Sequence, residues 1–190
     1  MYLLSGEKIT CGYGAVDIVI NCNIGVYKGK ISSVVGPNGA GKSTAMKALF
    51  GLLPIHHGKV VFDGKDITDL PPQQRVLRGM GFVPQTNNIF PSLTVQENLE
   101  MGAFIDQSNI KKMLEYVYDL FPILNDKKNQ NAGELSGGQR QQVAVGRALM
   151  TKPKLLMLDE PSAGVSPIIM DGLFTKIKEI ADQGTAVLMV

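Results

Sequence analysis

Gly36-Pro-Asn-Gly-Ala-Gly41-Lys42-Ser43 is the stretch that decides how this chain folds. It matches the pattern GxxxxGK[ST], whose glycines let backbone N–H groups converge on phosphate oxygens without interference from Cβ atoms. In that pattern Lys42 reaches the β- and γ-phosphates of a nucleotide, and the Ser43 hydroxyl coordinates Mg²⁺. Residues 31–35 are typical of a strand and residues 42–52 of a helix, whose N-terminus would face the phosphates. The stretch therefore predicts a phosphate-binding loop between a strand and a helix.

The residues on either side of this loop alternate between β-rich and helical patterns. This alternation predicts an α/β protein with a largely parallel sheet. We expect strands over 18–26, 30–35, 60–62, 81–83, 154–158 and 185–190. Helices are expected over 42–52, from Pro71-Pro72, from Thr94, over 106–121 with a stop at Pro122, over 136–147, and from Pro167 to about residue 181.

The length of 190 residues predicts a single domain over 1–190. Residues 88–151 are helix-rich and interrupt the strand pattern. We therefore expect a helical subdomain over 88–151, inserted into a nucleotide-binding core made of 1–87 and 152–190. An apolar strand pattern still runs at Val190, which indicates a fragment truncated at its C-terminus.

Composition excludes several classes of protein. Hydrophobic residues make up 44% of the chain and charged residues 19%, which excludes a disordered protein. A net charge of +2 without a Lys/Arg stripe argues against nucleic-acid binding. No apolar run is long enough to cross a bilayer, and the N-terminus lacks a secretory signal pattern. Cys11 and Cys22 lack metal-ligand spacing, which fits a reducing cytosol, and His56-His57 is expected in a surface turn.

A pair of carboxylates follows the apolar run Leu155-Leu-Met-Leu158. At the C-terminal edge of a parallel sheet, Asp159 and Glu160 would face the ligand crevice. Asp159 is the expected Mg²⁺ partner, and Glu160 is placed to orient and polarise an attacking water. Alone, such a run is more often a strand that ends at the surface. Downstream of a phosphate loop it indicates a hydrolytic site.

Leu135-Ser136-Gly137-Gly138-Gln139 is a second glycine-rich helix start. It is able to bind a phosphate group, and its plain alternative is a capped helix. The chain order is phosphate loop, Val83-Pro-Gln85, this LSGGQ stretch, and then the carboxylate pair. That order resembles the ATP-binding-cassette (ABC) family of ATPases over nearly the whole chain. The resemblance implies a P-loop NTPase fold with a mostly parallel sheet, a small antiparallel β region and an inserted helical subdomain.

The resemblance also implies ATP, Mg²⁺ and a role for each motif. Tyr13 would stack on adenine, although a lone tyrosine is more often ordinary packing. Gln85 would contact Mg²⁺ and the attacking water and couple to a membrane subunit. Such domains pair head to tail, so LSGGQ would bind the γ-phosphate held by the opposing subunit. The implied catalytic residues are Lys42, Gln85 and Glu160; the metal ligands are Ser43, Gln85 and Asp159; and the nucleotide-binding residues are Tyr13, Gly36, Pro37, Asn38, Gly39, Ala40, Gly41, Lys42, Ser43, Thr44, Ser136, Gly137, Gly138 and Gln139.

Further stretches over 58–64, 66–71, 88–99 and 160–167 resemble the ATPase subunits of branched-chain amino-acid importers of bacteria and archaea. That resemblance implies a paralogous second cassette, polytopic permease subunits and, indirectly, an extracytoplasmic solute-binding protein, at the cytoplasmic face of the plasma membrane. Phe90 with Pro91 would face the permease or pack within the helical segment. The alternatives are a urea or amide importer, a soluble ABC ATPase, a non-catalytic nucleotide-binding module and an unrelated P-loop kinase.

Two departures from the family pattern bear on catalysis. Ser166 stands where the commonest family loop has an aspartate, so communication between the two nucleotide sites is expected to differ. The switch residue that follows the last strand would lie beyond Val190, which puts hydrolysis by the chain as given in doubt.

Overall fold

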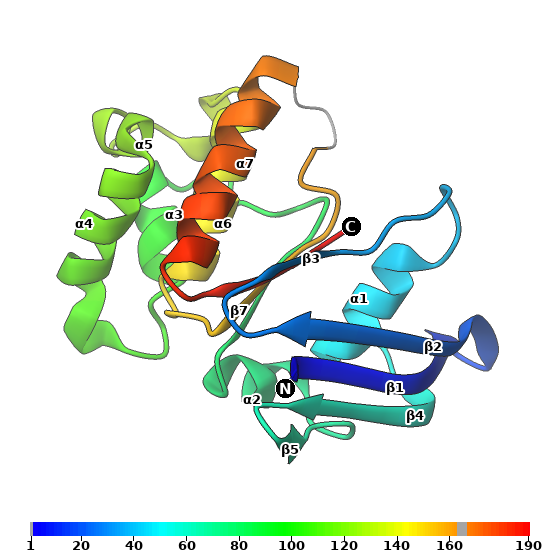
Figure 1. Ribbon diagram of the computed structural model, residues 1–190. Coiled ribbons are helices and arrows are strands. Elements are labelled where there is room, and N and C mark those ends of the chain that lie inside the picture. Colours follow the sequence, from blue (N-terminus) through cyan, green and yellow to red (C-terminus); the bar gives the residue numbers. More distant parts are fainter. Residues whose placement is uncertain (1, 163–166) are drawn as a thin grey trace.

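The structure is a computed structural model that describes residues 2–162 and 167–190. An antiparallel and a parallel four-stranded sheet lie side by side, and helices cover the parallel sheet (Figure 1). The antiparallel sheet, in the order β2-β1-β4-β5, contains β1 (Tyr2–Tyr13), β2 (Val16–Tyr27), β4 (Ile55–Phe62) and β5 (Lys65–Asp66). The parallel sheet, in the order β3-β8-β7-β6, contains β3 (Ile31–Ser33), β6 (Met80–Val83), β7 (Leu155–Leu158) and β8 (Ala186–Met189).

The helices divide between the two sides of the parallel sheet. The phosphate-loop helix α1 (Lys42–Phe50) lies on the side of the antiparallel sheet, and α6 and α7 lie on the other side (Figure 1). The full set is α1, α2 (Pro72–Leu77), α3 (Val95–Met101), α4 (Ile110–Leu120), α5 (Pro122–Asp126), α6 (Gly137–Leu149) and α7 (Pro167–Asp182), with 3-10 turns at Gln107–Asn109 and Ala132–Glu134.

Strand β7 is buried on both faces of the parallel sheet. All four of its residues are fully buried, as expected for a central strand of an α/β sheet. Leu155 and Met157 pack into the cluster that contains α1, whereas Leu156 and Leu158 pack into the cluster that contains α6 and α7. The period of two thus sends successive side chains into two different cores. The prediction of an α/β fold with a parallel sheet is confirmed.

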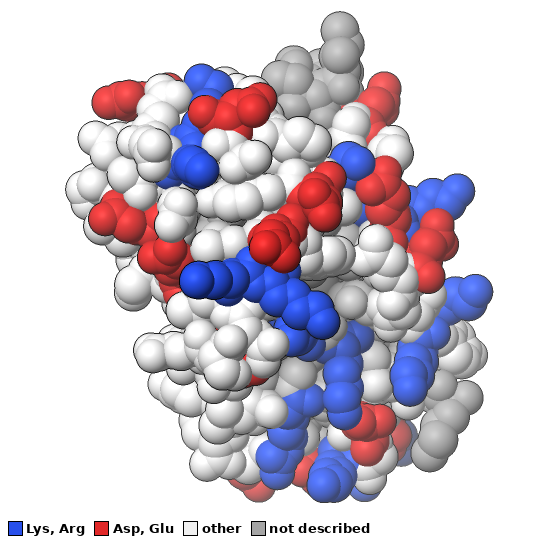
Figure 2. Space-filling view, turned by 90° about the vertical axis from the view of Figure 1, so that its left-hand side faces the viewer, with Lys and Arg blue, Asp and Glu red and all other residues white. Residues whose placement is uncertain are grey.

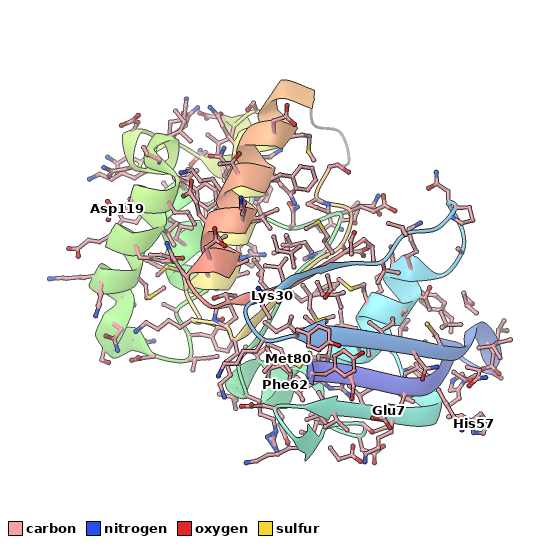
Figure 3. The ribbon with its side chains drawn as sticks, in the orientation of Figure 1. Glu7, Lys30, His57, Phe62, Met80 and Asp119 are labelled. Atoms are coloured by element: carbon pink, nitrogen blue, oxygen red, sulfur yellow. The ribbon has the colours of Figure 1, made fainter. Side chains whose placement is uncertain are left out.

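The antiparallel sheet corrects two expectations. The sequence pattern gave no strand before residue 18, yet β1 begins at Tyr2 and pairs with both β2 and β4. His56 and His57 lie inside β4 and not in a turn, and His56 Nδ1 lies 2.6 Å from Asp17 Oδ1. Figure 3 shows Phe62 of β4 and Met80 of β6 close together between the two sheets, where both are buried, with the exposed Glu7 and His57 at the outer side.

Two predicted capping boxes open α3 and α6. Thr94 caps α3 with Glu97, and Ser136 caps α6 with Gln139, with the reciprocal bonds present in both. The single helix expected over 106–121 is instead a 3-10 turn followed by α4. Its expected stop at Pro122 is also the first residue of α5, because the fixed φ of proline suits a first helical position.

A buried arginine fixes the far end of α1. Arg75 is 1% exposed and donates from Nη1 to the carbonyl oxygen of Leu49 at 2.7 Å, near the C-terminus of α1. Its Nε and Nη2 donate to the carbonyl oxygens of Leu70 and Thr68. Burial lowers the pKa of Arg75 to about 10. A cation at the negative end of the helix dipole stabilises α1, whose opposite end carries the phosphate loop.

Candidate nucleotide site

The phosphate loop crosses from β3 to α1 in an open turn. Gly39 and Gly41 have φ of 82° and 85°, in the left-handed region that favours glycine. A Cβ on Gly41 would lie 2.9 Å from Val19 Cγ2, so the loop also packs tightly on β2. Gly41 is the N-cap of α1, and no side chain of the described chain accepts a hydrogen bond there. The first-turn N–H groups, at Lys42, Ser43 and Thr44, thus belong to a helix start that is suited to an anion.

Lys42 lies across this loop. Its Nζ donates to the carbonyl oxygens of Gly36 and Pro37, each at 3.0 Å. The ammonium is therefore held over the same turn whose backbone N–H groups would hold phosphate. All nine predicted residues of this motif, Gly36, Pro37, Asn38, Gly39, Ala40, Gly41, Lys42, Ser43 and Thr44, lie in the loop or the first turn of α1.

The two carboxylates emerge at the same edge of the sheet as the loop. Ser33 of β3 pairs in register with Met189 of β8, which pairs with Leu158 of β7, so Asp159 follows at the same carboxyl edge. Asp159 is 2% exposed, and its Oδ1 is buried without a hydrogen-bond partner in the described part of the chain. Glu160 has φ of 47°, and its Oε2 accepts a 2.6 Å hydrogen bond from Gln85 Nε2.

This set of oxygens suits Mg²⁺. Magnesium prefers oxygen ligands, takes one or two carboxylates and relies on nucleotide phosphates for the rest. Asp159 Oδ1 is a buried acceptor that lacks a donor, and the amide oxygen of Gln85 is not used in the bond to Glu160. No group of three His, Cys, Asp or Glu side chains within the described ranges holds a metal by itself. Ser43, Gln85 and Asp159 could hold the ion together with phosphate oxygens, and this ligand set stays a prediction.

Tyr13 ends β1 and is 49% exposed. The β1–β2 turn that follows it lies on the same side of the molecule as the phosphate loop (Figure 1). Because Gly41 packs against Ile18 and Val19, the strand that follows this turn contacts the phosphate loop directly. An exposed aromatic ring at this point is suited to a planar base.

The LSGGQ stretch lies elsewhere. Ser136 Oγ accepts from the Gln139 N–H at 3.3 Å, and Gln139 Oε1 accepts from the Ser136 N–H at 3.1 Å. In Figure 1 the start of α6 lies at the top of the molecule, away from the phosphate loop at the right. The structure thus brings Gly36–Thr44, Gln85, Asp159 and Glu160 to one sheet edge and leaves Ser136, Gly137, Gly138 and Gln139 apart from them. Ser166 lies outside the described residues.

Sequence reasoning missed a clamp between the Gln85 loop and α6. Asn88 Nδ2 donates to Gln141 Oε1 at 2.9 Å, and Arg147 Nη2 donates to the Asn88 carbonyl oxygen, also at 2.9 Å. The guanidinium of Arg147 also lies 4.7 Å from the centre of the Phe90 ring. Gln141 and Arg147 are two of the five polar side chains on α6, so the sequence carried no signal that singled them out.

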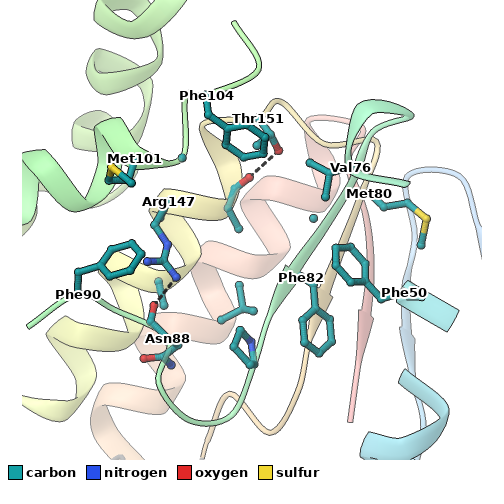
Figure 4. A pocket seen from close by; sticks show the side chains of 16 residues that line it. Phe50, Val76, Met80, Phe82, Asn88, Phe90, Met101, Phe104, Arg147 and Thr151 are labelled. Atoms are coloured by element: carbon teal, nitrogen blue, oxygen red, sulfur yellow. Dashed lines mark hydrogen bonds between the residues drawn. The ribbon is translucent and has the colours of Figure 1, made fainter. Parts of the chain in front are cut away.

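Beside this clamp lies an apolar groove of about 230 Å³ (Figure 4). Phe82 and Phe50 stack with ring centres 5.0 Å apart at one end. Phe90, Met101 and Phe104 line the other end and are 43%, 54% and 63% exposed. Phe90 thus packs on Arg147 within the helical segment and presents part of its ring to solvent, and its contact with a permease stays a prediction.

A phosphate loop between a parallel strand and a helix, with an Asp-Glu pair at the same sheet edge, defines a nucleotide-binding protein of the P-loop class. The chain belongs to the ABC transporter family, whose profile matches residues 19–163. It is an ATP-binding cassette and an ATPase. The unrelated P-loop kinase is thereby excluded. No helix within the described ranges is long and apolar enough to span a membrane.

Curated relatives are similar along most of their length. The chain is 41% identical to the probable branched-chain amino acid transport ATP-binding protein LivF of Archaeoglobus fulgidus, covering 95% of this chain and 77% of the relative. It is 39% identical to the high-affinity branched-chain amino acid transport ATP-binding protein BraG of Pseudomonas aeruginosa, covering 99% and 81%. It is also 35% identical to the lipopolysaccharide export system ATP-binding protein LptB of Haemophilus influenzae, covering 100% and 80%.

Solved structures confirm the predicted ABC ATPase fold. A nucleotide-free ATP-binding cassette from an ABC transporter is 33% identical, with a TM-score of 0.87 over 100% of this chain and 81% of that one. An ATP-binding cassette in an ADP conformation gives a TM-score of 0.86 at 33% identity, covering 100% and 80%. A dimeric post-hydrolysis cassette bound to ADP and Pi gives 0.84 at 25% identity, covering 98% and 87%.

Proposed function

We propose that this ATPase energises the import of branched-chain amino acids through a membrane permease. The names of the two relatives near 40% identity support this solute, and the LptB relatives share fewer identical residues, 33% to 35%. The solute would be recognised by the permease and a separate solute-binding protein. The cassette itself would supply the free energy of ATP hydrolysis.

The phosphate loop would bind the nucleotide. Backbone N–H groups of Gly39 to Thr44 would surround the phosphates, Lys42 would move its ammonium from the loop carbonyls to phosphate oxygens, and Tyr13 would stack on the base. Ser43, Gln85 and Asp159 would hold Mg²⁺. When bound, the ion neutralises phosphate charge as the bond to the leaving group breaks. The orphaned Oδ1 of Asp159 is the observation that supports this assignment.

Glu160 would orient the attacking water. The reaction is phosphoryl transfer from ATP to water. The water oxygen would bond to the γ-phosphorus, the bond from that phosphorus to the ADP oxygen would break, and the water proton would end on the released phosphate. The 2.6 Å bond from Gln85 to Glu160 holds the carboxylate at the sheet edge where the γ-phosphate would lie, and it is the single observation that carries the catalytic assignment. Lys42 would stabilise the charge on the transferred group.

Two chains would pair head to tail, so that the LSGGQ stretch of one reaches the nucleotide on the other. The separation of the two motifs in Figure 1 and the dimeric state of the solved ADP and Pi cassette support this pairing. Ser136, Gly137, Gly138 and Gln139 would contact the γ-phosphate. ATP then favours the closed pair because it contacts both chains there. We expect a paralogous partner cassette, as the resemblance to the branched-chain importer subfamily implies.

The apolar groove would receive a cytoplasmic segment of the permease. It lies next to the Gln85 loop, and its rim exposes three large side chains, a feature of protein-binding surfaces. Within this scheme residues 88–151 form the helical subdomain, and residues 1–87 and 152–190 form the core. The cassette would work at the cytoplasmic face of the plasma membrane.

The test is reconstitution in liposomes loaded with ATP, with the permease subunits and partner cassette that co-purify with this chain and with the solute-binding protein added outside. We expect uptake of leucine, isoleucine or valine, and loss of uptake in Glu160→Gln, which should still bind ATP. Uptake of urea or a short amide but not of leucine would overturn the solute. Full turnover by Glu160→Gln would overturn the assignment of the water-orienting residue.

A further inference from the structure

A basic hollow lies next to the apolar groove and shares Val76 and Thr151 with it. It measures about 410 Å³ and is formed by the end of α2, the β4–β5 turn and the segment between α6 and β7. Four cations line it, Lys65, Arg78, Lys152 and Lys154, against one carboxylate, Asp63. The whole chain carries a net charge of only +2, so positive charge is concentrated at this place.

Three of these four cations have no ion-paired or hydrogen-bonded side-chain partner among the described residues. Asp63 Oδ2 accepts a 2.6 Å bond from Lys154 Nζ, and both side chains are about half exposed. This bond and the charge of Lys154, with smaller contributions from Lys28 and Lys65, lower the pKa of Asp63. Lys65, Arg78 and Lys152 form no side-chain hydrogen bond or ion pair with the described part of the chain. Figure 2 shows basic side chains gathered over the middle and lower part of this face.

Apolar side chains lie among these cations. Leu77 lines the hollow and is 66% exposed, and Ile105 lines it beside Phe104, which is 63% exposed at the rim of the apolar groove. Lys152 has φ of 49°, a left-handed backbone in which glycine or asparagine is the usual residue. Lys152 thus has a backbone conformation that is disfavoured for lysine, and its side chain lines the hollow.

We propose that this basic hollow, with Leu77 and Phe104 at its edge, binds the anionic phospholipid surface of the membrane directly. Lysine and arginine side chains near a membrane attract acidic headgroups, and neighbouring apolar side chains enter the headgroup layer. Cations without fixed partners suit a fluid array of phosphates. The contact goes beyond the proposed coupling to a permease, and it is measured without one.

The experiment is co-sedimentation of the purified protein with vesicles of phosphatidylcholine alone and with vesicles that also contain phosphatidylglycerol. We expect binding to the anionic vesicles only, weakened by high salt because exposed charges are screened. Arg78→Gln with Lys152→Gln should reduce binding about 30-fold, as expected for two cations near the surface. The matched control, Lys8→Gln with Lys59→Gln, removes two exposed lysines of the antiparallel sheet and should bind like the unchanged protein.

Leu77→Asn should weaken binding at high salt more than at low salt, because it removes the apolar contribution alone. Equal binding to neutral and anionic vesicles, or equal loss in the two double variants, would overturn the proposal. Retention on immobilised polyglutamate without binding to anionic vesicles would also overturn it and point to an acidic protein partner. Nucleotide binding by Arg78→Gln with Lys152→Gln should be unchanged, so failure here is distinct from failure of the proposed ATPase site.

Discussion

The two glycine-rich helix starts of this chain are built in opposite ways. The start of α1 has a left-handed glycine as its cap, with no side-chain acceptor in the described chain, whereas the start of α6 is closed by the reciprocal bonds of Ser136 and Gln139. Both stretches have the composition of a phosphate-binding turn. The α1 start leaves the N–H groups of Lys42, Ser43 and Thr44 without an acceptor among the described residues, whereas the α6 start leaves only those of Gly137 and Gly138.

The difference indicates that the two turns have different roles in nucleotide binding. The α1 start, with Lys42 above it, is suited to hold a nucleotide by itself. At the α6 start the capping box already holds the Ser136 and Gln139 N–H groups, and the N–H groups of Gly137 and Gly138 would be left to contact a nucleotide held on another chain. Changes at the first turn should therefore alter binding by a single chain, and changes at the second should alter folding stability and the paired state.

The largest expected effect is at Lys42. Lys42→Ala removes a charge-assisted contact to phosphate, so the affinity of a single chain for ATP should fall about 10- to 100-fold. Calorimetric titration with ATP measures this, and circular dichroism checks that the variant is folded. Ser136→Ala, tested at a concentration where the protein is monomeric, should bind ATP as the unchanged chain does. Equal losses in the two variants would remove the contrast between the turns.

The next effect separates backbone strain from packing inside the α1 turn. Gly41→Ala puts a methyl group 2.9 Å from Val19 Cγ2 at a φ of 85°, whereas Gly39→Ala meets a similar φ of 82° with nothing within 4 Å. Both should lose about 1–2 kcal/mol to left-handed strain, and Gly41→Ala should lose more. Urea unfolding measures the two stabilities. A smaller loss in Gly41→Ala than in Gly39→Ala would show that the loop does not rest on β2.

A smaller effect is expected at the α6 cap. Ser136→Ala leaves the Gln139 N–H without its acceptor and should lower the free energy of unfolding by about 1 kcal/mol. Ser136→Thr keeps the acceptor and should lose less. Thermal or urea unfolding of the three proteins gives the comparison. No loss in Ser136→Ala would mean that the capping box does not stabilise this helix start.

The smallest expected effect is a pH dependence of stability at the α3 cap, because Glu97 of that cap titrates whereas Gln139 of the α6 cap does not. Hydrogen bonds from the backbone and side chain of Thr94 lower the pKa of Glu97 below its usual value of 4.5. A lowered pKa stabilises the fold above the unfolded value, and that contribution is lost as pH falls through the folded value. The stability difference between the unchanged protein and Thr94→Ala should therefore shrink below pH 4.5. The Ser136→Ala difference should stay constant with pH, because Gln139 does not titrate; urea unfolding at neutral and acid pH tests both.

Local chemistry explains which features the sequence alone could predict. The phosphate loop, both capping boxes and the buried strand β7 depend on residues within a few positions of one another, and they are placed as expected. Strand β1 was missed because register shifts interrupt its alternation, so its buried residues fall in runs instead of at every second position. His56 was misplaced because Gly58 suggested a turn, although the chain continues as a strand through a left-handed glycine.

Contacts between distant segments were beyond a local pattern. The bond from Gln85 to Glu160 joins residues 75 positions apart, and the Arg75 bonds to the end of α1 join residues 26 and 27 positions apart. The family resemblance supplied the role of Gln85, but nothing supplied Asn88, because its two partners lie on a helix more than 50 positions later. The tertiary fold decides which distant residues meet in such contacts, so no local sequence pattern indicates them.

The Asn88 clamp has a consequence for timing. It ties the loop that carries Gln85 to the helix that begins with LSGGQ, so the two segments should shift as one body. In the proposed head-to-tail pair, the Gln85 loop would contact the nucleotide bound to its own chain, and the LSGGQ stretch would contact the nucleotide bound to the neighbouring chain. Each chain would then couple the two nucleotide sites, so the two ATP molecules of a pair would be hydrolysed in a coordinated way and not independently.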